Sequence, residues 1–181
     1  MKGVYKDMEE ERIRQHSIIS DYDDEYLIYV SEFGTIYTIK WVEEKGKWKI
    51  RNLREIPSND GYSRVDIRHR CYMVSRLVAE TWLPMPVDFK HYDYEVHHID
   101  GNRANNKKEN LYFIKKKYHK TLHCIKSVRK LGDKEDISNF NLIDICGEDR
   151  WFLEDLLEKI KNSNEKKLKF NYQGNTYEVA V

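Results

Sequence analysis

The chain uses two hydrophobic periods in different parts of its length. Apolar and polar residues alternate, as in short strands, over residues 26–41, 47–56 and 61–67. The first of these segments contains a turn at Phe33-Gly34 and therefore predicts a pair of strands. Apolar residues instead recur at helical spacing over 71–82 and 150–162, and both segments predict amphipathic helices.

The remaining segments carry weaker patterns. Residues 6–19 place acidic side chains before basic ones, which agrees with the helix dipole and predicts an acidic helix. Residues 137–145 predict a strand, and residues 168–181 predict a hairpin that turns at 173–175. Together the elements predict an α+β fold with no internal repeat and no low-complexity linker.

The composition favours a folded protein without a membrane segment. The chain has 181 residues, which suits one ordinary domain or two small ones, and 13% of them are aromatic, too many for disorder. No apolar run approaches the roughly 20 residues that span a bilayer, and the first residues lack the apolar stretch of a signal peptide. We therefore expect a cytoplasmic protein that is neither secreted nor membrane-embedded. The three cysteines are far apart and form no CxxC pair, which fits a reducing compartment and argues against a thiolate zinc site.

The net charge of +1 conceals an uneven distribution of charge. Residues 101–130 contain ten Lys or Arg residues and a single acidic residue, and residues 45–76 contain nine Lys or Arg residues and three acidic residues. By contrast, residues 1–32 carry nine acids against four bases, and residues 133–158 carry nine against two. A basic centre interleaved with aromatic residues suits nucleic acid, because Lys and Arg displace condensed counterions from phosphates. An ordinary mixed surface is the alternative.

Histidine is concentrated in the same basic centre. His97 and His98 lie in a short strand pattern, whereas His119 and His123 are four residues apart on a predicted helix and share one face. Adjacent strand residues point to opposite faces, so one of His97 and His98 could bind a metal while the other acts as a base. That division suits hydrolysis, in which a metal holds the phosphate and a histidine activates water. A side-chain amide such as that of Asn110 could accept a hydrogen bond from the other ring nitrogen of the base.

The string VHHIDGNRANNKKENL (residues 96–111), followed by HxxxH, resembles the HNH (ββα-metal, or His-Me finger) endonucleases. Residues 75–84 resemble the segment that precedes this motif in phage-encoded and intron-encoded HNH enzymes of the homing type. Residues 31–39 resemble the start of a NUMOD4-like module, and the whole resemblance extends over about residues 25–125. It implies a ββα-metal nuclease core at 88–128, preceded by a small antiparallel β module with a helix at 25–87 that could contact DNA. Outside the resemblance, the sequence pattern predicts an acidic helix at 1–24 and a C-terminal α/β tail at 129–181 of unknown role.

The resemblance also implies roles for individual residues. His98 would be the general base, and Asn110 would fix the base and the loop geometry. One divalent metal would be held by His97, His119 and His123. Three imidazoles favour a borderline ion such as Zn²⁺ or Mn²⁺, although substrate phosphate oxygens could bring in Mg²⁺. The side chains expected to contact DNA phosphates, with a solvated surface as the alternative, are Arg103, Lys107, Lys108, Lys115, Lys116, Lys117 and Lys120.

These features predict a metal-dependent DNA endonuclease. The resemblance implies a phage or mobile-element setting, with action in the cytoplasm of the host cell. A single small site would nick one strand, and a homodimer could cut both. Two alternatives stay open at this point: a DNA-binding or regulatory protein with weak cutting, and a defence or anti-defence nuclease.

Other features have plainer interpretations. The adjacent histidines could be structural, and a zinc site with Cys124 is conceivable, although a helix turns Cys124 about 100° away from its neighbour His123. The four tryptophans are expected in the core, with base stacking as the alternative. The helix over 150–162 is expected to pack on the C-terminal hairpin, and a dimer or partner interface is the alternative.

Overall fold

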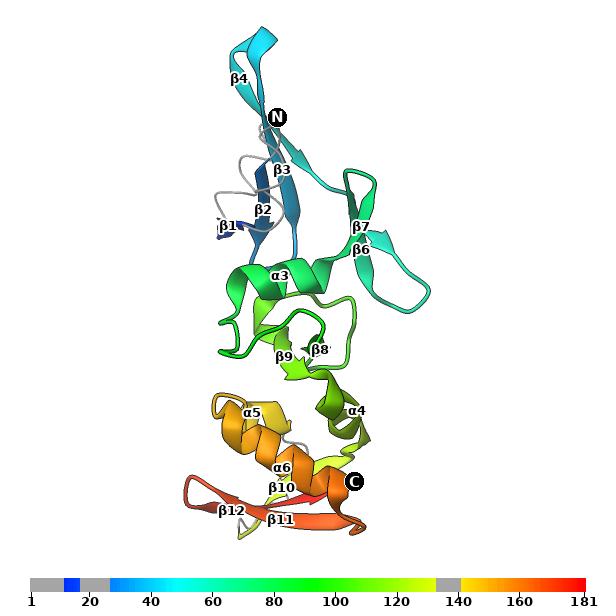
Figure 1. The fold of residues 1–181 in the computed structure, drawn as a ribbon, viewed down its shortest axis with the longest axis vertical. Coiled ribbons are helices and arrows are strands. Elements are labelled where there is room, and N and C mark those ends of the chain that lie inside the picture. The colour runs from blue at the N-terminus through cyan, green and yellow to red at the C-terminus, as the bar shows by residue number, and fades with distance from the viewer. Residues whose placement is uncertain (1–11, 17–26, 133–140) are drawn as a thin grey trace. The chain divides into compact units, whose positions relative to one another are not determined.

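The structure is a computed structural model, and it describes residues 12–16, 27–132 and 141–181 (Figure 1). Its contacts divide the chain into two compact units, Met1–Phe89 with Val96–Phe113, and Lys90–Glu95 with Ile114–Val181. The division passes through the strands β8 and β9, which therefore belong to both units. Mixed helices and antiparallel sheets make the fold α+β, as predicted.

The first sheet of the first unit is antiparallel and has the order β1-β2-β3-β4. Its strands are β1 (Ile13–Gln15), β2 (Leu27–Ser31), β3 (Ile36–Val42) and β4 (Lys47–Asn52), with the 3-10 turn η1 (Glu43–Lys45) before β4. The turn predicted at Phe33-Gly34 is confirmed, because it joins β2 to β3. The helix predicted over 6–19 is wrong at Ile13–Gln15, which pair with β2, and its other residues, apart from Arg12 and His16, lie outside the described ranges.

A second, three-stranded sheet leads into the first helix. It consists of β5 (Ile56–Pro57), β6 (Ser63–Ile67) and β7 (Arg70–Met73), and α3 (Val74–Trp82) follows. The helix begins three residues later than the predicted Cys71, because Cys71 and Tyr72 pair with β6. The apolar face of α3 is buried through Leu77 and Val78, and the helix packs against β1, β2, β6 and β7.

The histidine-rich segment folds as a strand, a loop, a strand and a helix, as predicted. These elements are β8 (Tyr94–His98), η2 (Lys108–Asn110), β9 (Leu111–Lys115) and α4 (Lys116–Cys124). Strands β8 and β9 form a two-stranded sheet. Phe113 of β9 is buried and meets Phe89 edge-on, with ring centroids 5.2 Å apart, which anchors β9 in the core of the first unit.

The C-terminal part of the second unit is a sheet with the order β10-β12-β11 and two helices. Its elements are β10 (Ser127–Lys130), α5 (Leu142–Cys146), α6 (Arg150–Asn162), β11 (Lys167–Tyr172) and β12 (Asn175–Ala180). The predicted helix and hairpin are confirmed, and Phe152 of α6 packs on the rings of Phe170 and Tyr172. The strand predicted over 137–145 is wrong from Leu142 on, because the side chain of Asn141 caps a short helix; residues 137–140 lie outside the described ranges.

Three tryptophans do not occupy the core expected for them. Trp41, Trp48 and Trp151 are exposed, and the first two form an edge-to-face pair across β3 and β4. Trp82 is partly buried and donates its indole N–H to the carbonyl oxygen of Val30. Within the described ranges, no helix has both the length and the apolar character that a membrane crossing requires.

Candidate nuclease site

His97 and His98 have different surroundings, as their adjacent positions in β8 predict. Both side chains are buried, at 6% and 4% exposure. The imidazole of His97 belongs to a histidine cluster, whereas that of His98 lies beside Asn106 and the ring of Tyr62. The strand therefore separates two chemical environments that are one residue apart.

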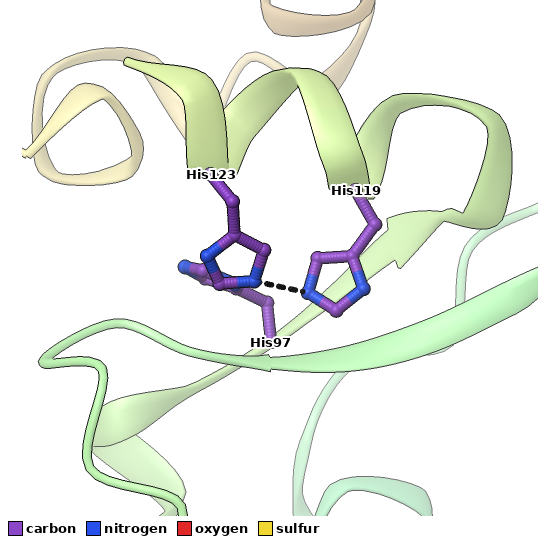
Figure 2. Close-up of side chains that lie close together, drawn as sticks. All are labelled: His97, His119 and His123. Carbon is purple, nitrogen blue, oxygen red and sulfur yellow. Dashed lines mark hydrogen bonds between the residues drawn. The ribbon is translucent and has the colours of Figure 1, made fainter. Parts of the chain in front are cut away.

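The histidine cluster brings together the three predicted metal ligands. One ring nitrogen from each of His97, His119 and His123 lies within 4.8 Å of the others, and Figure 2 shows the three imidazoles turned toward one another. His119 and His123 are one helical turn apart on α4, with their Nε2 atoms separated by 3.1 Å. Cys124 is not part of this cluster of histidines.

The donor set fits a divalent transition metal. Two nitrogens bound at about 2.0–2.1 Å to one tetrahedral ion lie roughly 3.4 Å apart, close to the observed Nε2 separation. His119 Nδ1 is 2.6 Å from a carboxylate oxygen of Glu95, in the same unit. A carboxylate on one ring nitrogen keeps a proton there and leaves the other nitrogen available to a metal. Glu95 thus orients His119 Nε2 toward the cluster.

The amide beside His98 differs from the one expected. Asn106 Oδ1 lies 3.2 Å from His98 Nε2, whereas the prediction assigned this contact to Asn110. Asn110 organises the loop instead: its Oδ1 accepts from Asp100 N, its Nδ2 donates to Asp100 Oδ1, and its carbonyl oxygen accepts from Ile99 N. Asn110 therefore holds the chain that follows His98, and Asn106 contacts the ring itself.

The carboxylate of Asp100 accepts several of the hydrogen bonds that hold the loop between β8 and β9. Burial by itself raises the pKa of Asp100, but hydrogen bonds from Asn105 Nδ2, Asn102 N and Asn110 Nδ2 outweigh it and hold the pKa below its ordinary value. The group is therefore ionised at neutral pH. Because it accepts from donors on both sides of the loop, it closes the segment between β8 and β9.

The predicted phosphate-binding side chains fall into two groups. Several already have partners within the protein: Lys108 with Glu32, Lys115 with Glu154, Lys117 with Glu158, and Arg103 with the carbonyl oxygen of Asp60. Among the described residues, Lys116 and Lys120 of α4 form no ion pair, and both are exposed. Lys107 belongs with the partnered group, because its Nζ lies 5.9 Å from the ring centroid of Phe33.

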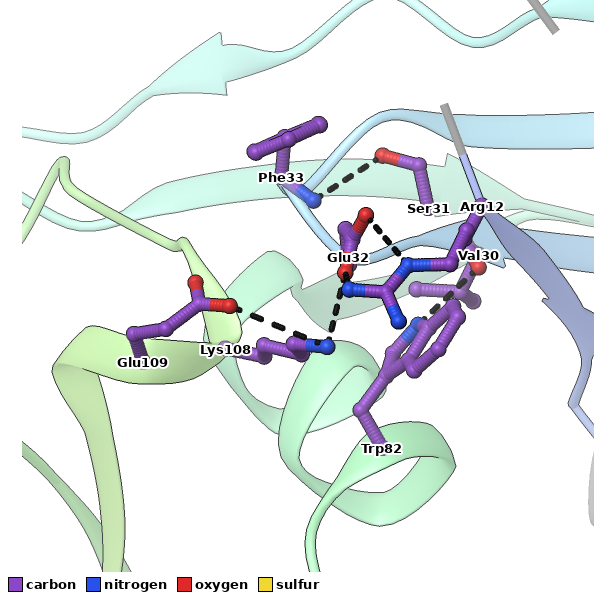
Figure 3. Close-up of polar contacts among 8 residues, drawn as sticks. All are labelled: Arg12, Val30, Ser31, Glu32, Phe33, Trp82, Lys108 and Glu109. Atoms are coloured by element: carbon purple, nitrogen blue, oxygen red, sulfur yellow. Dashed lines mark hydrogen bonds and ion pairs between the residues drawn. The ribbon is translucent and has the colours of Figure 1, made fainter. Parts of the chain in front are cut away.

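Glu32, in the turn after β2, ties the first sheet to the loop before Asn110 (Figure 3). Its carboxylate accepts from Arg12 and pairs with Lys108 Nζ at 2.7 Å, while its carbonyl oxygen accepts from Lys108 N. Hydrogen bonds from Arg12 and then from Lys108 lower the pKa of Glu32 to about 2. The folded state therefore favours the ionised carboxylate.

We predict that Glu32→Gln reduces the loss of stability in acid. The folded pKa of about 2 lies below the ordinary 4.5, so the stabilisation is present above pH 4.5 and disappears as the pH falls toward 2. Urea denaturation across this range should give a shallower pH dependence for Glu32→Gln than for the wild type, and a lower midpoint at neutral pH. Glu44→Gln, at an exposed carboxyl, is the control. Equal pH dependences of the wild type and Glu32→Gln would contradict the linkage.

Comparison with known proteins identifies the segment that carries these histidines. Residues 72–121 match a family model described as HNH endonuclease. The chain carries an HNH endonuclease domain. The matched residues of this HNH domain run from β7 into α4, and include His97, His98 and His119 but end before His123.

Two further comparisons accompany this match. The chain is similar to a solved structure described as "DNA binding and cleavage by the HNH homing endonuclease I-HmuI", with 19% identity, a TM-score of 0.43, and coverage of 94% of this chain and 98% of that one. Curated proteins give no match.

Reasoning from the sequence missed three contributors to the site of the HNH domain. Asn106 lies in the NN pair of the motif, so its residue type was a signal, but spacing does not say which amide reaches the base. Glu95 alternates with His97 along β8, which places both on one face of the strand. Glu32 is separated from Lys108 by most of the first unit, and no local pattern connects them.

Proposed function

We propose that the HNH domain hydrolyses DNA phosphodiester bonds with the help of one divalent metal ion. The observation that carries this proposal is the pairing of a three-histidine cluster with a separate, buried histidine one residue away on β8. His97, His119 and His123 would hold the metal, and Zn²⁺ or Mn²⁺ suits their nitrogens better than Mg²⁺. The ion, when bound, would stabilise the negative charge that develops on the phosphate and the leaving oxygen.

The protein's own groups supply the proton transfer. In the proposed mechanism, His98 takes a proton from the attacking water through Nδ1, since Asn106 Oδ1 accepts at Nε2. The loop closed by Asp100 and Asn110 holds the backbone after His98, so the ring keeps its direction during the reaction. The resemblance to HNH enzymes supports products with a 5′-phosphate and a 3′-hydroxyl.

Cleavage of supercoiled plasmid tests the proposed function. The full chain is incubated with plasmid in EDTA and in Mg²⁺, Mn²⁺ or Zn²⁺, and the nicked and linear products are separated on a gel. Metal-dependent cleavage supports the proposal, and a nicked product that precedes the linear one supports a monomer that cuts one strand per visit. DNA binding without cleavage of this plasmid or of fragmented bacterial and phage DNA would favour the DNA-binding alternative. The phage or mobile-element setting, cytoplasmic action and a possible homodimer belong to the same proposal.

The two groups of basic side chains lead to a prediction about DNA binding. We expect Lys116→Gln with Lys120→Gln to reduce the slope of log K against log salt by about 2, because each lost phosphate contact removes about 0.9. Lys115→Gln with Lys117→Gln should change the slope less, since Glu154 and Glu158 already offset these charges. Fluorescence anisotropy of a labelled duplex over a range of salt concentrations measures both. A larger change for the second pair would assign the phosphate contacts to Lys115 and Lys117 instead.

A further inference from the structure

We propose that the turn between β2 and β3 is a working part of the catalytic site: through Gly34 it fixes Asn106, and Asn106 positions the imidazole of His98. This inference rests on the proposed function, in which His98 is the general base. It makes the first sheet a support for catalysis in addition to any contact with DNA. The residues that carry it all belong to the first compact unit.

Asn106 presents a defined acceptor to the base. Its Oδ1 lies 3.2 Å from His98 Nε2, while its Nδ2 donates to the carbonyl oxygen of Ala104 at 3.4 Å. That second bond shows which end of the amide faces the ring. Because an amide oxygen accepts and cannot donate, a neutral His98 must keep its proton on Nε2, and its lone pair lies on Nδ1. Asn106 is 5% exposed, so water competes little for the contact.

Gly34 holds Asn106 by close approach of the two backbones. A Cβ added at Gly34 would lie 3.0 Å from Asn106 Cβ and 3.5 Å from its carbonyl oxygen. Gly34 also has φ of +103°, which L side chains rarely adopt. Glycine is therefore required at position 34 for two reasons: the positive φ of the turn and the short distance to Asn106. No larger residue allows the turn to come this near to Asn106.

The turn that carries Gly34 is itself held on both sides. The buried hydroxyl of Ser31 accepts from Phe33 N and Thr35 N, which closes the turn internally. Glu32 O accepts from Lys108 N at 2.8 Å, two residues beyond Asn106. The turn between β2 and β3 thus contacts the loop between β8 and β9 at two positions, Asn106 and Lys108. Such support from surrounding residues is what keeps a catalytic ring in one orientation.

A second turn of the same unit contacts His98 from another direction. The ring of Tyr62 lies 5.7 Å from that of His98, centroid to centroid. Arg103, in the loop after His98, donates to the carbonyl oxygen of Asp60 and lies over the Tyr62 ring. The turn between β5 and β6 therefore lies beside the base itself, while the turn between β2 and β3 acts on it through Asn106. The orientation of the base does not depend on β8 and β9 alone.

Two substitutions at Asn106 separate positioning from packing. Asn106→Leu has a similar shape but no acceptor, whereas Asn106→Asp keeps an oxygen at the same place. For metal-dependent plasmid cleavage, we expect Asn106→Leu to lower kcat by about tenfold to a hundredfold with little change in KM, and Asn106→Asp to recover most of that rate. Equal losses in both variants, or losses confined to KM, would overturn the positioning role.

The ring tautomer gives a readout that does not need an active enzyme. Long-range ¹⁵N–¹H correlation spectra of the full chain, recorded well above the ordinary histidine pKa of about 6.5, distinguish a proton on Nε2 from one on Nδ1. The His98 signals are assigned by their absence from His98→Gln. The wild type should show the Nε2–H form and Asn106→Leu a mixture. A mixture in the wild type would overturn the inference, even if plasmid cleavage fails and the proposed function with it.

The role of the turn is tested at Gly34 against a matched glycine. Gly132 has a similar φ of +96°, but a Cβ added there meets nothing within 4 Å. Gly34→Ala should therefore lower kcat and broaden the His98 tautomer signal, whereas Gly132→Ala should keep wild-type cleavage. Thermal unfolding identifies any variant that fails to fold, and Asn106→Leu then carries the test. A folded Gly34→Ala with wild-type kcat would overturn the part assigned to the turn.

Discussion

Replacing His98 with alanine is expected to lower the rate of plasmid cleavage by about 10³-fold while leaving the affinity for DNA nearly unchanged. The imidazole is 4% exposed and lies against Asn106 Oδ1, in surroundings that suit proton transfer better than phosphate binding. Removing a base slows the reaction without removing contacts to the phosphates. Single-turnover cleavage measures the rate, and fluorescence anisotropy in EDTA measures the affinity.

The control for this variant is His91→Ala, which removes an exposed histidine that precedes β8. It should cleave like the wild type. His98→Gln adds a second comparison, because a glutamine fills part of the cavity that alanine leaves. His98 would be a structural residue if His98→Ala lost much of its DNA affinity, or if His98→Ala and His98→Gln both unfolded at the assay temperature. Rates within a few-fold of the wild type would remove it from the mechanism.

The part of the site that could be predicted from the sequence is the part with local spacing. Two histidines four apart on a helix must share a face, and adjacent histidines on a strand must not. These two rules are sufficient to place His119 with His123 and to separate His97 from His98. The structure brings His97 to the helical pair and leaves His98 with Asn106, an arrangement that these rules allow.

The parts that differ depend on contacts between distant residues. Nothing near Asn106 in the sequence distinguishes it from Asn110 as the partner of the base, because the choice depends on the turn at Gly34. The short strand Ile13–Gln15 has the composition of a helix, and pairing with β2 decides its conformation. Likewise, the apolar residues after Asn141 fit a strand, but a side-chain cap begins a helix there. Tertiary pairing and capping override propensity at these positions.

The second large effect is expected at the metal cluster. We predict that His119→Ala raises the Kd for Zn²⁺ or Mn²⁺ by more than about 100-fold, and that Glu95→Gln raises it by about 10-fold to 100-fold, since outer ligands usually contribute that much. His119 supplies Nε2 to the cluster, and Glu95 fixes the ring by accepting from Nδ1. His119→Ala, which removes a ligand, should therefore raise the Kd more than Glu95→Gln, which removes only the hydrogen bond that orients it. Isothermal titration of the metal into the full chain without DNA measures both constants.

Cleavage assays connect this affinity to the proposed reaction. Excess Mn²⁺ should restore much of the rate of Glu95→Gln, whose three imidazoles are intact, and little of the rate of His119→Ala. Lys120→Ala, next to His119 on the same helix, should bind metal like the wild type. If His119→Ala bound metal as tightly as the wild type, the ion would have to sit elsewhere, and the three histidines would be a structural cluster. If metal bound normally to every variant that failed to cleave, the defect would lie in DNA binding or in His98, and the cluster would lose its assigned role.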